Sequence, residues 1–385
     1  MIPYGRQYIT ESDIEAVVEV LRSDYLTQGP KVPEFEKSIK QACGSKHAVA
    51  VNSATSGLHI ACLALGAKPG DYIWTSPNSF VASANCALYC GANIDFVDIN
   101  PNTFNMCHER LEEKLIVAKA INKLPKIVIP VHLTGQPCNM AEIHRLSKIY
   151  GFSIIEDASH CIGGKYKNRP IGSCEFSDVA VFSFHPVKII TTAEGGAITT
   201  QSNELSQKMA LLRSHGITRD ESLMTHDSDG PWYYQQILLG LNYRMTEMQA
   251  ALGISQMSRL NEFISRRHVL AARYDEELKG LHVDTPYQHP DSYSAYHLYV
   301  IQPHFEKISK THKQVFEELR NNGLGVNLHY IPIHTQPFYR DLGFKADDFP
   351  FSVDYYRRSI SIPLYHSMTD LQQDEVISTL KRILV

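Results

Sequence analysis

The segment from Val179 to Thr200, VAVFSFHPVKIITTAEGGAITT, constrains the fold more than any other part of the chain. It begins with a run of apolar, mostly β-branched or aromatic residues, which predicts a buried strand. Pro186 ends this strand, because proline cannot donate to a sheet ladder and disfavours helix at the preceding residue. A second strand is predicted at Ala197–Thr200, so a hairpin-like loop joins the two strands.

Lys188 lies in this loop, between Val187 and the apolar pair Ile189 and Ile190. A free lysine amine has a pKa of about 10.4, and apolar surroundings lower it. A lysine with a lowered pKa can form a Schiff base with an aldehyde. The loop taken alone is equally compatible with an exposed lysine that has no chemical role.

An aspartate 31 positions before Lys188 favours the chemical interpretation. Residues Ile154–Asp157 predict a strand, and Asp157 is its last residue. A carboxylate at the carboxyl end of a parallel strand lies where open α/β sheets bind ligands. An aspartate and a lysine in this order are typical of a pyridoxal 5′-phosphate (PLP) site. There the carboxylate keeps the pyridine nitrogen protonated and the lysine binds the aldehyde.

A candidate phosphate site precedes both residues in the chain. A strand is predicted at His47–Val51 and a helix at Leu58–Leu65, joined by the small and hydroxyl residues of NSATSG. A helix N-terminus offers unpaired N–H groups and the positive end of the helix dipole, which suit a phosphate. Simple capping of the helix by serine or threonine is the commoner explanation of such a turn. Together with Asp157 and Lys188, the turn favours a phosphate cradle.

Composition excludes several other classes of protein. The chain has 37 basic and 41 acidic residues, so no basic excess indicates nucleic-acid binding. No apolar run approaches the roughly 20 residues of a membrane span, and the N-terminus lacks the apolar core of a signal peptide. Neither Cys86 and Cys90 nor His329 and His334 are accompanied by further ligands at zinc spacing, so no metal site is predicted. We therefore expect a cytoplasmic protein with reduced cysteines.

The strings EDASHCIG, SFHPVK and TTAEGGA resemble the DegT/DnrJ/EryC1/StrS family of sugar aminotransferases, and the resemblance extends from YGRQYI to SISIPLYHSMTD. It implies an α/β protein of the fold-type I PLP-dependent aminotransferase class, with a mainly parallel central sheet flanked by helices. The alternation of predicted apolar strands and helices independently favours such a sheet. A large PLP-binding domain is expected at residues 1–261 and a smaller C-terminal α+β domain at 262–385.

The resemblance also implies roles for particular residues. Lys188 and Asp157 would be catalytic, and Phe80 would stack on the pyridine ring. His160 would hydrogen-bond the ring oxygen or support Asp157, although a purely structural histidine fits equally well. The expected cofactor-binding set is Ser53, Ala54, Thr55, Phe80, Asp157, His160, Ser183, Lys188 and Asn242. The expected substrate-binding set is Tyr4, Asp24, Tyr25, Leu26, Thr27, Ala54, Ser183, Asn242 and His329.

Two expectations concern the second half of the chain. In the motif GLNYRMTE, the resemblance implies that Asn242 reaches the phosphate site of a partner subunit, so that a homodimer shares its active sites. Arg244 and Glu247 are three residues apart at a helix start, and we predict an ion pair between them. In the small domain, strands are predicted near Tyr299–Gln302 and Val326–Tyr330.

The expected substrates are L-glutamate and a UDP-linked 4-keto-6-deoxy sugar. Strings such as SDYLTQG, VNSATSGL, RSHGI and NYRMTEMQAALG are most similar to family members of pseudaminic acid biosynthesis. This similarity implies amination of UDP-2-acetamido-2,6-dideoxy-β-L-arabino-hex-4-ulose to UDP-4-amino-4,6-dideoxy-N-acetyl-β-L-altrosamine.

Two alternatives are another nucleotide-linked keto-sugar as the substrate and a non-catalytic regulator of the same fold. A sugar dehydratase of this fold is disfavoured, because in the family that chemistry replaces the lysine by histidine.

Overall fold

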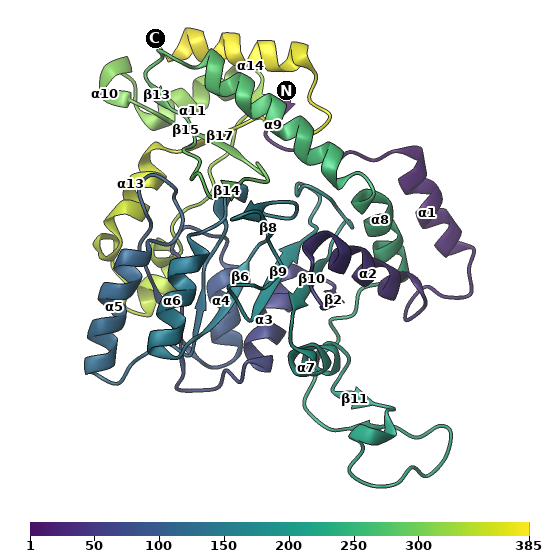
Figure 1. Ribbon diagram of the computed structural model, residues 1–385. Helices are drawn as coiled ribbons and strands as arrows, with labels where there is room; N and C mark the ends of the chain where they lie inside the picture. The colour runs from purple at the N-terminus through teal and green to yellow at the C-terminus, as the bar shows by residue number, and fades with distance from the viewer. Residues whose placement is uncertain (385) are drawn as a thin grey trace.

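A seven-stranded sheet forms the centre of the computed structural model, which describes residues 1–384 (Figure 1). Its strand order is β2-β10-β9-β6-β5-β3-β4. Strand β10 is antiparallel to both of its neighbours, and the other neighbouring pairs are parallel. The predicted mainly parallel sheet is therefore confirmed. The strands are β2 (His47–Val51), β3 (Tyr72–Thr75), β4 (Asn93–Phe96), β5 (Ile127–Ile129), β6 (Ser153–Asp157), β9 (Val179–Ser183) and β10 (Gly196–Thr200).

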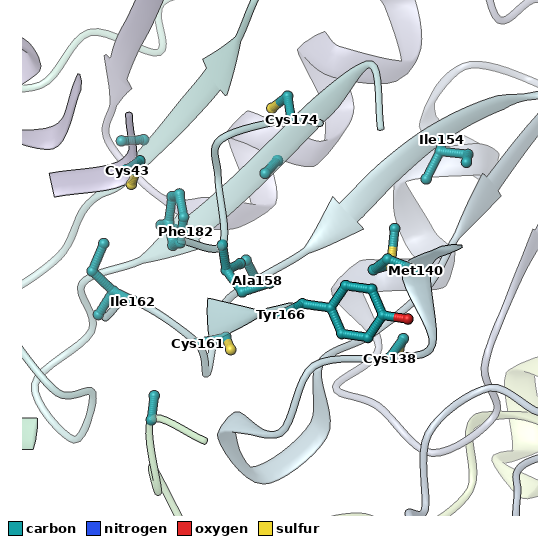
Figure 2. Packing of buried hydrophobic residues seen from close by; sticks show 14 of the residues in the cluster. Cys43, Cys138, Met140, Ile154, Ala158, Cys161, Ile162, Tyr166, Cys174 and Phe182 are labelled. Carbon is teal, nitrogen blue, oxygen red and sulfur yellow. The ribbon is translucent and has the colours of Figure 1, made fainter. Parts of the chain in front are cut away.

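Helices cover both faces of this sheet, because successive side chains of a strand point to opposite faces. In β9, Val179 and Val181 pack with α3, α4 and α7 on one face, whereas Ala180 and Phe182 pack with α2, α5 and α6 on the other. Figure 2 shows part of the core on this other face, around Phe182 and including Cys43 and Cys174. All eight cysteines are free and buried. The helices are α2 (Lys31–Cys43), α3 (Ala54–Ala64), α4 (Ala82–Tyr89), α5 (His108–Ala120), α6 (Met140–Tyr150) and α7 (Asn203–Arg213).

The same alternation orients the end of β6. Ile155 packs in the core that contains α3, and Asp157 is two residues further along the strand. Glu156 therefore points to the opposite face, where His132 Nε2 lies 2.7 Å from its Oε2. Gly57 lets α3 approach the sheet closely, because a Cβ at this position would lie 2.9 Å from Val181 Cγ1. The N-terminus of α3 is thereby held beside the end of β6 that carries Asp157.

The C-terminal part of the chain builds a second core. Helices α9 (Leu260–Glu277) and α14 (Asp370–Ile383) lie side by side at the end of the molecule that bears both termini (Figure 1). They pack on a sheet of β13 (Val283–Asp284), β15 (Tyr299–Pro303) and β17 (Ile360–Ile362). The N-terminal strand β1 (Ile2–Pro3) pairs with β16 (Leu324–Gly325). Within residues 1–384, no helix combines the length and apolar character needed to cross a bilayer. The division at residue 261 remains a prediction.

The predicted strand Val326–Tyr330 is wrong. Asn327 makes an isolated bridge to Ser361, and the ladder stops there. The Asn327 side chain explains the interruption, because its Oδ1 accepts the N–H of Leu328 at 2.9 Å and replaces a strand partner.

The predicted ion pair between Arg244 and Glu247 is also contradicted. Glu247 begins α8 (Glu247–Met257), and only 1% of the residue is exposed. Its carboxylate accepts the backbone N–H groups of Lys31 at 2.6 Å and Val32 at 3.3 Å. These groups open α2, where backbone donors lack intrahelical partners and a negative charge is stabilised. Glu247 thus caps a helix that is remote in the sequence.

We expect Glu247→Ala to lower the free energy of unfolding by about 1–3 kcal/mol, because two donors at the start of α2 lose their acceptor. Urea unfolding followed by circular dichroism measures the change. Glu15→Ala is the matched control, since Glu15 is exposed on α1 (Glu11–Leu21). Equal stabilities of the two variants would contradict a capping role for Glu247.

Candidate active site

A cavity of about 600 Å³ opens at the carboxyl ends of β6 and β9. It is lined by residues of the central sheet, of the α3 N-terminus and of the segment that follows β16. The sequence-predicted residues that line it are Tyr4, Ser53, Ala54, Thr55, Phe80, Asp157, His160, Ser183, Lys188 and His329. The fold thus brings together residues from widely separated parts of the chain.

Hydrogen bonds to both of its oxygens fix the orientation of the Asp157 carboxylate. Ser83 Oγ donates to Oδ2 at 2.5 Å, and the Ser159 N–H donates to Oδ1 at 3.2 Å. Ser79 Oγ lies 2.6 Å from Ser83 Oγ and extends this chain of hydroxyl groups. Asp157 is 4% exposed. A buried carboxylate held in this way can accept a proton or a hydrogen bond from a bound ligand in one direction only.

Lys188 is partly buried in the loop after β9, where its backbone N–H donates to the carbonyl of His185 at 2.9 Å. Burial lowers the pKa of Lys188 to about 8, and the charge of Asp157 opposes this shift. An amine with a pKa of about 8 is neutral in roughly one molecule in ten at pH 7, compared with about one in 2,500 for an ordinary lysine. The amine is therefore available as a nucleophile near neutral pH.

The N-terminus of α3 forms the wall of the cavity at Ser53, Ala54 and Thr55. Ser53 caps the helix by accepting the N–H of Ser56 at 3.1 Å. The N–H groups of Ala54 and Thr55 have no acceptor among residues 1–384. Gly196 lies directly against them, and a Cβ there would be 2.6 Å from the nitrogen of Ala54. These two N–H groups suit an anion, because the helix dipole adds to their positive charge.

His160 is buried beside Lys188 but makes no hydrogen bond to Asp157. Its Nδ1 accepts the N–H of Thr134 at 3.2 Å, and its Nε2 lies 3.1 Å from Tyr330 Oη. Burial lowers the pKa of His160 well below its ordinary value, and the charge of Lys188 acts in the same direction. The imidazole is therefore neutral. Of the two roles expected for His160, direct support of Asp157 has no geometric basis.

Several residues that line the cavity were not expected from the sequence. His297 packs its ring on His160 with centroids 4.4 Å apart, and its Nδ1 is buried without a partner among residues 1–384. Other polar examples include Ser79, Ser83, Glu194, Asn327 and Tyr330. His297 and Tyr330 lie in segments rich in polar aromatic residues, and this composition was only weak evidence that they line a site. Nothing in the sequence pointed to the two serines, since a serine in a loop, such as Ser79, or in an apolar helix, such as Ser83, is ordinary.

Five predicted residues lie outside the cavity of this chain: Asp24, Tyr25, Leu26, Thr27 and Asn242. Asn242 is exposed, and its backbone bridges to Ser214. Tyr25 and Leu26 are also exposed. The carbonyl of Leu26 accepts the N–H of Glu247 at 3.1 Å, so the loop 24–27 lies beside the motif that contains Asn242.

The residues of the cavity fit PLP. The unpaired N–H groups of Ala54 and Thr55 suit its phosphate, and the fixed Asp157 carboxylate suits a protonated pyridine nitrogen. Lys188 supplies an amine with a lowered pKa for its aldehyde. Phe80 is 58% exposed in this chain and lines the cavity, where an aromatic ring can cover a planar ligand.

Comparison with known proteins supports this interpretation. A model described as the DegT/DnrJ/EryC1/StrS aminotransferase family matches residues 7–381. The chain is 38% identical over 390 residues to a protein of Campylobacter jejuni subsp. jejuni serotype O:23/36 (strain 81-176). That protein is named UDP-4-amino-4,6-dideoxy-N-acetyl-beta-L-altrosamine transaminase, and the match covers 100% of this chain and 98% of the relative.

Two solved structures share the fold over nearly their whole length. Helicobacter pylori PseC, described as an aminotransferase involved in the biosynthesis of pseudoaminic acid, has a TM-score of 0.89 and 31% identity. The match covers 100% of this chain and 99% of that one. The PLP form of Spr1654 from Streptococcus pneumoniae has a TM-score of 0.89 and 29% identity, covering 99% and 98% of the two chains.

We expect the Lys188 amine of the cofactor-free protein to titrate near pH 8, and Asp157→Asn to lower its pKa further. The sign follows from charge, because the Asp157 carboxylate stabilises the ammonium form and the amide does not. Competitive labelling with acetic anhydride between pH 6 and 11, read by mass spectrometry of the Lys188 peptide, measures both values. An unchanged or higher pKa in Asp157→Asn would show that the two groups do not interact.

Proposed function

The chain belongs to the DegT/DnrJ/EryC1/StrS aminotransferase family, and we propose that this PLP-dependent sugar aminotransferase uses L-glutamate as its amino donor. The acceptor is C4 of UDP-2-acetamido-2,6-dideoxy-β-L-arabino-hex-4-ulose, and the product is UDP-4-amino-4,6-dideoxy-N-acetyl-β-L-altrosamine. The convergence of Lys188, Asp157 and the α3 N-terminus on one cavity carries the proposal of transamination. The name of the relative from Campylobacter jejuni supports the choice of sugar.

The catalytic groups divide the work between binding and proton transfer. PLP, when bound, withdraws electrons from the Cα atom of the amino donor and so makes its proton acidic. The neutral Lys188 amine accepts that proton as a general base, and its ammonium form returns a proton as a general acid. A pKa near 8 suits both tasks at neutral pH. Asp157 holds positive charge on the pyridine nitrogen, which sustains the electron withdrawal.

The remaining residues of the cavity bind and orient. Ser53, Ala54, Thr55 and Ser183 surround the place of the phosphate, at the α3 N-terminus and the end of β9. Phe80 covers one face of the pyridine ring. Tyr4 and His329, whose ring centroids are 5.0 Å apart, form the side on which the sugar nucleotide enters.

A homodimer completes the active site in this proposal. Asn242 and the loop 24–27 are exposed and absent from the cavity of their own chain, and the loop contacts Glu247 at the end of the Asn242 motif. In a two-fold dimer each chain would place these residues at the cavity of its partner. Asn242 would then reach the partner's phosphate site, and Asp24, Tyr25, Leu26 and Thr27 would contact its sugar nucleotide.

Absorbance of the PLP-loaded protein tests the proposed reaction. We expect L-glutamate to remove the visible absorbance of the cofactor bound at Lys188, and the L-arabino keto-sugar to restore it. A panel of other UDP-4-keto-6-deoxy sugars is the control for specificity. Restoration by a different sugar keeps the aminotransferase and removes the named substrate. No response to any amino donor would favour a non-catalytic protein of the same fold. Lys188→Ala should bind PLP weakly and show no turnover.

Mixing two inactive variants tests whether the active site is shared. Lys188→Ala and Asn242→Ala each disable both sites of their own dimers. After subunit exchange, about half of the dimers are mixed, and each mixed dimer has one complete site if Asn242 acts on the partner. We therefore expect about one quarter of the wild-type activity. Recovery of none would place Asn242 at the site of its own chain, and full activity of Asn242→Ala alone would place it outside any site.

A further inference from the structure

Tyr330 lines the cavity, and the proposed reaction gives its hydroxyl group no role. Its ring lies 6.2 Å from that of Phe80 and 6.0 Å from that of His160, measured between centroids. It therefore stands beside the place assigned to the cofactor ring. Burial raises the pKa of Tyr330, and the negative charge of Asp157 acts in the same direction. The phenol remains protonated at every pH at which the enzyme would work.

The hydrogen bonds of His160 determine which way the Tyr330 proton points. The Thr134 N–H donates to His160 Nδ1 at 3.2 Å, so Nδ1 carries no proton. The neutral ring must then carry its single proton on Nε2, which lies 3.1 Å from Tyr330 Oη. His160 is consequently the donor and the Tyr330 oxygen the acceptor. The hydroxyl proton of Tyr330 therefore has no acceptor among residues 1–384.

We propose that the Tyr330 hydroxyl donates a hydrogen bond to a negatively charged or carbonyl oxygen of the ligand bound beside Lys188. Tyr330 would contact the ligand directly, whereas His160 would be a positioning residue that acts through Tyr330. The inference rests on the proposed function, because it takes the ligand to be PLP with a substrate. It also gives His160 a role that differs from both roles expected from the sequence.

A donor of this kind selects one class of ligand atom. Because its oxygen already accepts from His160, Tyr330 can only donate, and a ligand hydroxyl that must itself donate is disfavoured there. Two oxygen atoms of the proposed reactants have the required character. One is the phenolic oxygen attached to the pyridine ring of PLP, called its ring oxygen here. The other is the C4 keto oxygen of the sugar. The first carries negative charge and the second gains it as an amine adds, and a hydrogen-bond donor stabilises both charges.

Tyr330→Phe tests the proposal, because it removes the hydroxyl and keeps the ring. Loss of a hydrogen bond to a charged group is expected to lower a rate or an affinity about 10- to 100-fold. The PLP-loaded variant is compared with wild type in its absorbance between pH 6 and 10, its affinity for PLP and its two half-reactions. Tyr339→Phe is the matched control, since Tyr339 donates to Asn85 Oδ1 at 2.5 Å and does not line the cavity.

The measurements distinguish the two oxygen atoms. A shifted absorbance spectrum and weaker PLP binding without substrate would support a bond to the ring oxygen. An unchanged spectrum with only the keto-sugar half-reaction slowed would support a bond to the C4 oxygen. Wild-type values for all of these quantities would overturn the proposal. Absorbance and PLP affinity need no turnover, so they remain informative if the wild-type enzyme fails to aminate the expected sugar.

Discussion

The parallel pairing of β6 with β9 is the constraint on which the site depends. Its register places Asp157 opposite Val181, two residues before the end of β9. The chain that leaves β9 carries Lys188, and the antiparallel return of β10 confines that chain to the loop of residues 184–195. The carboxylate and the amine are thereby brought to one edge of the sheet, although 31 residues separate them. The cavity forms there because the segment after β16 covers this edge.

Low exposure then determines the charge of the groups around Lys188. Burial lowers the pKa values of His160, His297 and His329, and the charge of Lys188 acts in the same direction on each of them. Burial raises the pKa of Tyr330. All four groups are therefore neutral at pH 7, and they offer hydrogen bonds without competing charge. Such surroundings stabilise a charge that develops on a ligand, because fixed dipoles need no reorganisation.

Local patterns explain which parts of this arrangement could be predicted. Apolar runs identified β6 and β9, since parallel strands covered on both faces need apolar residues throughout. Chemistry that depends on neighbours in the chain, such as Lys188 among apolar residues, was equally visible. Contacts between distant segments were not: Glu247 caps α2, Ser83 supports Asp157, and Tyr330 faces His160. The strand expected at Val326–Tyr330 failed because the side chain of Asn327 replaces a ladder partner. Residue preferences for strands do not predict this side-chain hydrogen bond.

The orientation of a single proton shows how far such distant contacts carry into function. The turn at Leu133–Gly135 follows β5 and presents the Thr134 N–H to His160, so the tautomer of His160 is set by the loop after a strand. That tautomer turns Tyr330 into an obligatory donor. The loop, the histidine and the tyrosine come from three separate segments of the chain. The direction of one hydrogen bond determines the direction of the next, and no charge moves. A sugar or cofactor oxygen beside Lys188 would therefore meet a donor whose direction was fixed when the chain folded.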